Sequence, residues 1–163
     1  TLGGDGHQPA TEPGNPNILY SQWQQGNLTR HDRITGENVY IKPQPRPGEP
    51  AERFNWDAPI NVSAHDPKRI YFASQRVWRS DNRGDSWTPI SGDLTKNGNR
   101  MHMPMMGRTW SVEAGWDIYA MSEYHTIANF AESPVDENIL WVGTDDGQIQ
   151  VTTDGGQSWK KID

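Results

Sequence analysis

Three carboxyl groups lie beside tryptophans and are the residues best suited to acid–base chemistry. Asp57 follows Trp56, while Glu113 and Asp117 lie on either side of Trp116. Glycoside hydrolysis uses two carboxyl groups about 5–9.5 Å apart, and an apolar wall beside one of them keeps it protonated. We therefore name Asp57, Glu113 and Asp117 as candidate catalytic residues. Other acidic residues fall in expected turns: Asp81, Asp85, Asp136, Asp145, Asp146 and Asp154.

A run of soft ligands occupies residues 101–106, which read MHMPMM. Thioether and imidazole groups suit Cu(I), so Met101, His102 and Met103 are candidate metal ligands. Methionine is also a flexible filler of apolar gaps. Packing of a loop is the interpretation we favour, and we expect neither a metal nor a cofactor.

Aromatic side chains gather between residues 92 and 124, a stretch much longer than a plain turn. Long ordered loops on a rigid scaffold often carry the binding surface of a protein. Exposed aromatic faces suit carbohydrate, and burial between neighbouring sheets is the alternative for at least half of them. The candidate ligand-binding residues are Trp56, Trp110, Trp116 and Tyr119.

Two further motifs have both a structural and a functional interpretation. Asp145-Asp146-Gly147 suits calcium or a carboxylate pair, but it stands where a hairpin turn is expected, and we favour the turn. Residues 42–50 contain four prolines, which favour a stiff extended connection over a ligand for a partner's aromatic groove.

The elements that must position these residues come from an internal repeat. Residues 80–87 (SDNRGDSW) align without gaps on residues 152–159 (TTDGGQSW), and an isoleucine follows three residues after each tryptophan. In each turn the Asn or Asp accepts backbone N–H bonds, the glycine permits positive φ, and the tryptophan returns to the core. The expected structural residues are Ser80, Asn82, Gly84, Trp87, Thr152, Asp154, Gly156 and Trp159.

Each copy predicts four short strands, at about 58–63, 69–74, 76–79 and 87–90, and at about 126–131, 139–144, 147–151 and 158–162. A weaker third copy opens the chain, where residues 17–21 resemble 138–142. We therefore predict an all-β chain, a β-propeller fragment of about three four-stranded antiparallel blades with one long insertion. Its parts are a degenerate first blade with the proline-rich connection (1–50), a second blade (51–91), an insertion loop (92–125) and a third blade (126–163).

The composition fits many turns between short aromatic strands. Only 33% of residues are hydrophobic and the mean hydropathy is −0.90, yet the chain has eight Trp, sixteen Gly and twelve Pro. The formal net charge of −6 and the lack of a Lys/Arg cluster argue against nucleic-acid binding. There is no cysteine for a disulfide, and no apolar run approaches the roughly 18 residues of a membrane helix.

The pattern Ser/Thr-x-Asn/Asp-x-Gly-x-Ser-Trp resembles the Asp-box of BNR-repeat β-propellers. Longer stretches, residues 53–60, 91–95 and 142–147, resemble a group of large exported bacterial repeat proteins described as sortilin-like or glycosyl-hydrolase-like. The resemblance implies an extracellular or periplasmic protein. Three blades cannot close a ring of the usual four to eight, so we expect the remaining blades of a larger propeller, or other subunits, as partners.

Two functions fit that resemblance. The one we favour is a non-catalytic module that binds or scaffolds a carbohydrate or protein partner. The alternative is a part of a glycoside hydrolase, either sialidase-like, with an arginine cluster, or xyloglucanase-like, with two facing carboxylates. No catalytic residue can be carried over by motif.

Overall fold

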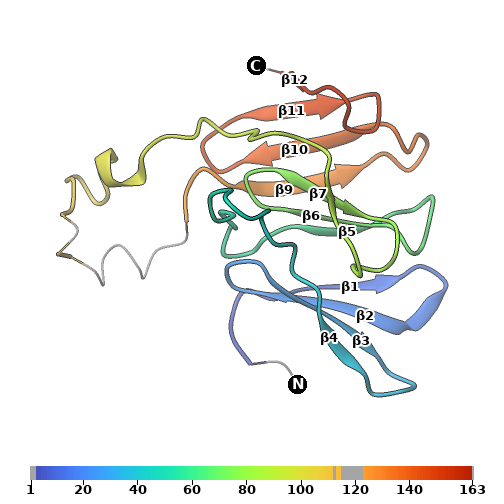
Figure 1. The fold of residues 1–163 in the computed structure, drawn as a ribbon. Helices are drawn as coiled ribbons and strands as arrows, with labels where there is room; N and C mark the ends of the chain where they lie inside the picture. The colour runs from blue at the N-terminus through green and yellow to red at the C-terminus, as the bar shows by residue number, and fades with distance from the viewer. Residues whose placement is uncertain (1–2, 112, 115–122, 163) are drawn as a thin grey trace.

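The computed structural model describes residues 3–111, 113–114 and 123–162. These residues form three four-stranded antiparallel sheets, which Figure 1 shows as three stacked layers. The predicted all-β class, with three four-stranded blades, is confirmed. Blade 1 holds β1 (Gln8–Glu12), β2 (Asn15–Trp23), β3 (Asn27–Asp32) and β4 (Asn38–Tyr40). Blade 2 holds β5 (Ile60–Val62), β6 (Ile70–Ala73), β7 (Val77–Ser80) and β8 (Thr88–Pro89), and blade 3 holds β9 (Ile127–Glu132), β10 (Leu140–Thr144), β11 (Ile149–Thr152) and β12 (Lys160–Lys161).

Helix is almost absent from the described residues. The one helical element there is a 3₁₀ turn, η1 (Arg100–His102), in the insertion between β8 and β9. Within the part of the chain that the structure describes, no helix has the length and apolar character needed to cross a membrane.

The core lies between the blades because side chains alternate across each strand. All four residues of β6 are buried: Ile70 and Phe72 face blade 1, while Tyr71 and Ala73 face blade 3. Phe72 stacks on Phe54 with ring centroids 5.2 Å apart, and Tyr71 meets Phe130 at 5.0 Å. A strand that is buried on both faces identifies blade 2 as the middle layer.

The first strand of each blade lies at the inner edge of its sheet. β5 contacts both β1 and β9, whereas β4, β8 and β12 are the outer edges. The blades therefore fan out from a common axis, as expected for a propeller. The loop end carries the turns after β2, β6 and β10 and the long connections between blades, and the turn end carries residues 80–87 and 152–159.

Blade 1 has the longest strands although its copy of the repeat is the weakest. β2 runs for nine residues, and from Asn17 onward buried side chains alternate with half-buried ones. Ile18, Tyr20 and Gln22 point into the interface with blade 2, because Ile18 and Tyr20 belong to the same core cluster as Ile70 and Phe72. Strand alternation, and not the turn motif, specifies this blade.

Candidate functional site at the loop end

The segment Asn55–Asp57 lies where the three blades meet at the loop end. From blade 1, Gln22 Nε2 donates to the Trp56 carbonyl oxygen at 3.1 Å, and Gln8 Nε2 donates to the Asp57 carbonyl oxygen at 3.4 Å. On the other side, Asn55 Nδ2 donates to Thr126 Oγ1 at 2.9 Å, just before β9 of blade 3. The segment is thereby fixed from both neighbouring blades.

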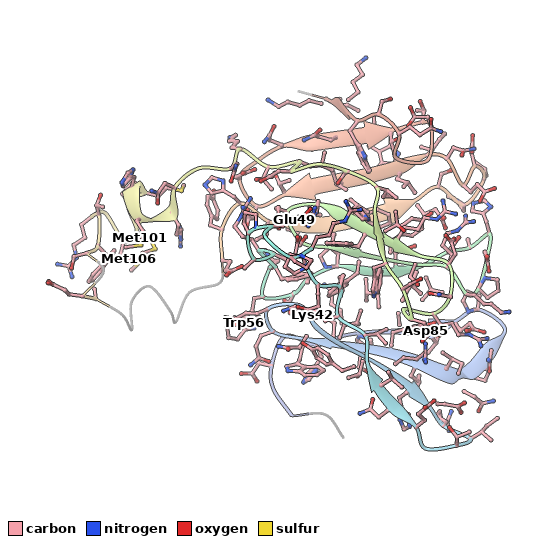
Figure 2. All side chains as sticks on the ribbon, in the orientation of Figure 1. Lys42, Glu49, Trp56, Asp85, Met101 and Met106 are labelled. Atoms are coloured by element: carbon pink, nitrogen blue, oxygen red, sulfur yellow. The ribbon has the colours of Figure 1, made fainter. Side chains whose placement is uncertain are left out.

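Trp56 and Asp57 present their side chains from this junction. Trp56 is half-buried and Asp57 is exposed. The indole edge of Trp56 lies against the backbone at Gly6, where an added Cβ would be 2.6 Å from Trp56 Cδ1 and 2.6 Å from Asp57 Oδ1. Gly6 also has φ +64°, so the close approach requires glycine. Figure 2 shows Trp56 at the loop end, on the side from which the insertion projects.

The hairpin turn after β10 closes the far side of the junction. Asp145 accepts hydrogen bonds from Thr126 N at 3.0 Å and from Thr126 Oγ1 at 2.7 Å. Asn55 Nδ2 lies 3.4 Å from Asp145 Oδ2, while Asn55 Oδ1 accepts from Asp57 N at 3.1 Å. The Asp145 carboxylate thus belongs to a polar network that reaches Asp57 through Asn55. Among the described residues, no group of three or more His, Cys, Asp or Glu side chains could hold a metal ion.

Asp146, the next residue of that turn, binds both ends of the insertion, where the insertion leaves and rejoins the blades. Asp146 Oδ2 accepts from Lys96 N at 2.7 Å and from His125 Nδ1 at 2.6 Å. Thr144 Oγ1 donates to the other carboxylate oxygen. Burial favours a higher pKa for Asp146, but the hydrogen bonds from Thr144 and His125 outweigh burial and lower its pKa. The carboxylate therefore stays charged in a nearly inaccessible position, with His125 and Asp146 exposed by only 4% and 6%.

Three further hydrogen bonds tie the loop end together. Arg53 donates from Nη2 to Asp93 Oδ2 at 2.6 Å and from Nε to the His125 carbonyl oxygen at 3.2 Å. Phe54 N donates to Glu123 Oε2 at 3.1 Å. Desolvation of that carboxyl group raises the pKa of Glu123, although the residue as a whole is exposed. Connection 41–59 and the insertion thus meet at this end.

The insertion carries the remaining predicted site residues. Trp110 Nε1 donates to the Met105 carbonyl oxygen at 2.9 Å, and the Arg108 guanidinium lies 3.6 Å from the Trp110 ring centroid, so one ring face is covered. Met105 is buried, which fits apolar packing, whereas Met106 is 92% exposed. Figure 2 places Met101 and Met106 away from the blades.

The predicted catalytic residues are not brought together among the described residues. Asp57 lies at the junction, whereas Glu113 is an exposed residue of the insertion whose backbone N–H bonds to Ser111. Asp117, Trp116 and Tyr119 lie outside the described residues. The residues that sequence reasoning missed are Asn55, His125 and Asp146. For the Asp-Asp-Gly turn the sequence favoured a hairpin turn over calcium or a carboxylate pair, and no local pattern links Asp146 to residues 96 and 125.

The two repeated turns lie at the opposite end. In blade 2, Asn82 Oδ1 accepts from Ser86 N at 2.9 Å and Gly84 N donates to Ser80 Oγ at 2.8 Å. In blade 3, Asp154 and Thr152 repeat these bonds at 2.9 and 3.0 Å. Hydrogen bonds from Ser158 and Thr152 lower the pKa of Asp154 to about 2. Trp87 and Trp159 are half-buried, so they close the margin of the core and do not enter its centre.

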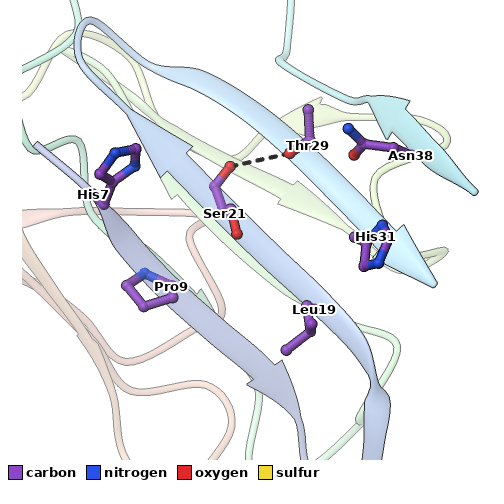
Figure 3. A pocket seen from close by; sticks show the side chains of 7 residues that line it. All are labelled: His7, Pro9, Leu19, Ser21, Thr29, His31 and Asn38. Atoms are coloured by element: carbon purple, nitrogen blue, oxygen red, sulfur yellow. Dashed lines mark hydrogen bonds between the residues drawn. The ribbon is translucent and has the colours of Figure 1, made fainter. Parts of the chain in front are cut away.

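A shallow groove of about 460 Å³ lies on the open face of blade 1. Figure 3 shows its lining side chains on β1 to β4 and at His7, just before β1, with Thr29 Oγ1 donating to the Ser21 carbonyl oxygen at 3.5 Å. The lining residues are His7, Pro9, Leu19, Ser21, Thr29, His31 and Asn38. This face points away from blade 2, because Leu19 and Ser21 alternate with the buried Tyr20.

Comparison with solved structures identifies proteins of similar fold. The GH74 xyloglucanase from Xanthomonas campestris matches over 93% of this chain with a TM-score of 0.56 and 17% sequence identity. A GH74 enzyme from Niastella koreensis matches over 98% with a TM-score of 0.55 and 12% identity. The chain spans only 21% and 22% of the length of those chains. No family model and no curated protein matches this sequence. At these identities the likeness shows a shared propeller-type fold.

Proposed function

We propose that this chain is a non-catalytic carbohydrate-binding module of an exported β-propeller protein, with its ligand held at the loop end by Trp56 and Asp57. The observation that carries the proposal is the junction itself. A half-buried indole and an exposed carboxylate stand side by side on a segment bonded to both neighbouring blades. Such pre-organisation lowers the entropy lost when a ligand binds.

The chemistry of this pair suits a neutral sugar. An indole presents a large apolar face against which the C–H face of a pyranose ring can pack, and binding sites combine such surfaces with a few fixed polar groups. Asp57 supplies an acceptor for sugar hydroxyl groups next to that face. The fold likeness to a xyloglucanase makes a glucan the first ligand class to test.

The alternative function is a part of a glycoside hydrolase. That function requires a second carboxylate facing Asp57. Asp145 is the carboxylate that Asn55 connects to Asp57, but Thr126 already donates twice to it. We therefore prefer binding without hydrolysis.

The two repeated turns take a structural role in this proposal. We interpret residues 80–87 and 152–159 as Asp-boxes that join one blade to the next, which leaves the loop end for the ligand. An extracellular location is part of the same proposal, since polysaccharide ligands are met outside the cytoplasm.

Calorimetric titration with xyloglucan and cello-oligosaccharides tests the site. We expect saturable binding that Trp56→Ala weakens about tenfold or more, as for loss of a stacked aromatic anchor. Trp141→Ala is the matched control, because Trp141 is 42% exposed on blade 3. Failure of every glycan to bind, or unchanged affinity in Trp56→Ala, would reject the proposed site.

A further inference from the structure

The free face of blade 3 carries an exposed apolar surface. Trp141, Ile149 and Ile162 are 42%, 52% and 41% exposed. They come from β10, from β11 and from the residue after β12, and Leu140 and Val142, which alternate with Trp141, are buried against blade 2. Large apolar side chains gathered on one sheet face mark an interaction surface.

The same positions in blade 2 are buried by a neighbouring blade. The repeat aligns Tyr71 with Trp141, and Val77 with Ile149 through the paired registers of their hairpins. Tyr71 and Val77 are 1% and 0% exposed, because they pack in the core between blades 2 and 3. The surface on blade 3 is therefore the counterpart of a surface that is covered inside the molecule.

The same kind of hydrogen bond is present at both blade–blade interfaces. Trp87 Nε1 donates to the Ile41 carbonyl oxygen at 2.7 Å, and Trp159 Nε1 donates to the Ile90 carbonyl oxygen at 3.0 Å. In each case the isoleucine directly follows the outer strand of the preceding blade. The tryptophan of one blade thus caps the outer edge of the blade before it.

A glycine accompanies each of these bonds. An added Cβ at Gly84 would be 2.5 Å from Ile41 Cδ1, and one at Gly156 would be 2.8 Å from the Ile90 carbonyl oxygen. The turn of the following blade therefore packs directly on the isoleucine, and the space between them admits no side chain.

Ile162 has the same backbone position as these two acceptors. Ile41 N donates to the Leu28 carbonyl oxygen and Ile90 N to that of Val77, both at 2.9 Å, while Ile162 N donates to that of Ile149 at 2.8 Å. Ile162 therefore stands at the same backbone position as the two isoleucines whose carbonyl oxygens accept from Trp87 and Trp159.

We infer that Trp141, Ile149 and Ile162 form an interaction surface for a further four-stranded blade, whose own Ser/Thr-x-Asn/Asp-x-Gly-x-Ser-Trp turn donates an indole N–H to the Ile162 carbonyl oxygen. The inference is independent of the proposed ligand site, which lies at the loop end.

A second copy of this chain, placed head to tail, does not supply that turn. Its blade 1 would meet blade 3, and in the repeat alignment blade 1 has Asn38 where Trp87 and Trp159 stand and Thr35 where the two glycines stand. It lacks both the indole and the small residue that the two interfaces use. The partner is therefore a blade whose turn carries the tryptophan and the glycine found in blades 2 and 3.

The chain contains no cysteine, so a single thiol can report on this face. We would introduce Ile149→Cys into two proteins. One is the chain of 163 residues, and the other is a tandem chain in which residues 91–162 are repeated after Asp163. In the tandem chain only the first copy carries the thiol. We expect alkylation by N-ethylmaleimide to slow about tenfold or more in the tandem chain, as for other sites protected by burial.

Two controls make the result specific. Val135→Cys, at a position 87% exposed in the turn between β9 and β10, should react equally fast in both chains. Changing Trp159 to alanine in the appended copy alone should restore much of the alkylation rate of the Ile149→Cys thiol. Equal alkylation of that thiol in the single and tandem chains overturns the inference. Protection in the single chain that grows with protein concentration also overturns it, in favour of a second copy.

Discussion

His125 and Asp146 form a buried pair at the base of the insertion, with Nδ1 2.6 Å from Oδ2. His125 precedes β9 of blade 3, and Asp146 lies in the turn between β10 and β11. The same carboxylate oxygen holds the backbone of Lys96, which lies 29 residues before His125 in the chain. One aspartate therefore joins the two ends of the insertion to blade 3.

The first prediction concerns this anchor. Asp146→Ala leaves the Lys96 N–H and the His125 ring nitrogen without their shared acceptor, which costs about 1–3 kcal/mol for the buried His125 ring. We expect faster amide hydrogen exchange at residues 94–99 and 123–127, measured by mass spectrometry, with blade 1 unchanged. Asp136→Ala, in an exposed turn, is the control. Unchanged exchange in Asp146→Ala would show that other contacts hold the insertion.

The second prediction concerns the tryptophans that join the blades. Because Trp87 is half-buried, Trp87→Ala should cost near the lower end of the about 3–5 kcal/mol found for buried aromatics, measured by urea unfolding. Trp87→Phe keeps most of the apolar contact but removes the N–H bond to Ile41, and should cost about 1 kcal/mol. A loss below about 1 kcal/mol for Trp87→Ala would refute a joining role for the turn.

The third prediction separates backbone strain from contact. Gly36 and Gly156 both have positive φ, at 75° and 97°, but only Gly156 meets a neighbour, the Ile90 backbone. Gly36→Ala should therefore report strain alone, about 1 kcal/mol. Gly156→Ala should lower the thermal midpoint clearly further. Equal shifts for the two variants would mean that the turn does not pack tightly on blade 2.

The fourth prediction concerns acid. The pKa of Asp154 is lowered to about 2 from 3.8 by bonds from Ser158 and Thr152. A lowered carboxyl pKa stabilises the fold above the unfolded value, and this stabilisation is lost as the pH falls toward the folded one. The free energy of unfolding should therefore fall less between about pH 5 and pH 2 in Asp154→Asn than in the unmodified chain.

Asn82 makes that substitution a matched one. Asn82 occupies the equivalent position in blade 2 and makes the same turn with a neutral side chain. Asp154→Asn should therefore fold at about pH 5 with the same strand signal in circular dichroism. If the stability of both proteins in urea falls equally between about pH 5 and pH 2, Asp154 does not contribute to the acid response.

The repeat made the blades predictable, since it determines where strands begin and turns occur. Predicted strands at about 69–74 and 139–144 became β6 (Ile70–Ala73) and β10 (Leu140–Thr144). Blade 1 was harder because its turn lacks the tryptophan, and its glycine, Gly36, stands one position later than in the other two turns. It forms nevertheless, since Ile18, Tyr20 and Leu28 face blade 2.

The candidate site was only partly predictable. Trp56 and Asp57 were named because an aromatic residue and a carboxylate are adjacent in sequence. The contacts that fix them are long-range: Asn55 reaches Thr126, 71 residues away. The turn interpretation was favoured for Asp146 because a hairpin turn is expected there. Local sequence carries no sign that Lys96 and His125 would contact it. Such contacts depend on how blades stack, which the repeat does not encode residue by residue.

The central claim is that the loop end binds a glycan without cleaving it. The most direct measurement follows binding and cleavage in one sample. Tryptophan fluorescence is recorded during titration with a xyloglucan oligosaccharide, and the recovered sugar is analysed by mass spectrometry after prolonged incubation. The account predicts saturable binding, weakened in Trp56→Ala, with the oligosaccharide recovered intact. Shortened oligosaccharide from the unmodified chain, abolished by Asp57→Asn with binding retained, would contradict it and establish a glycoside hydrolase.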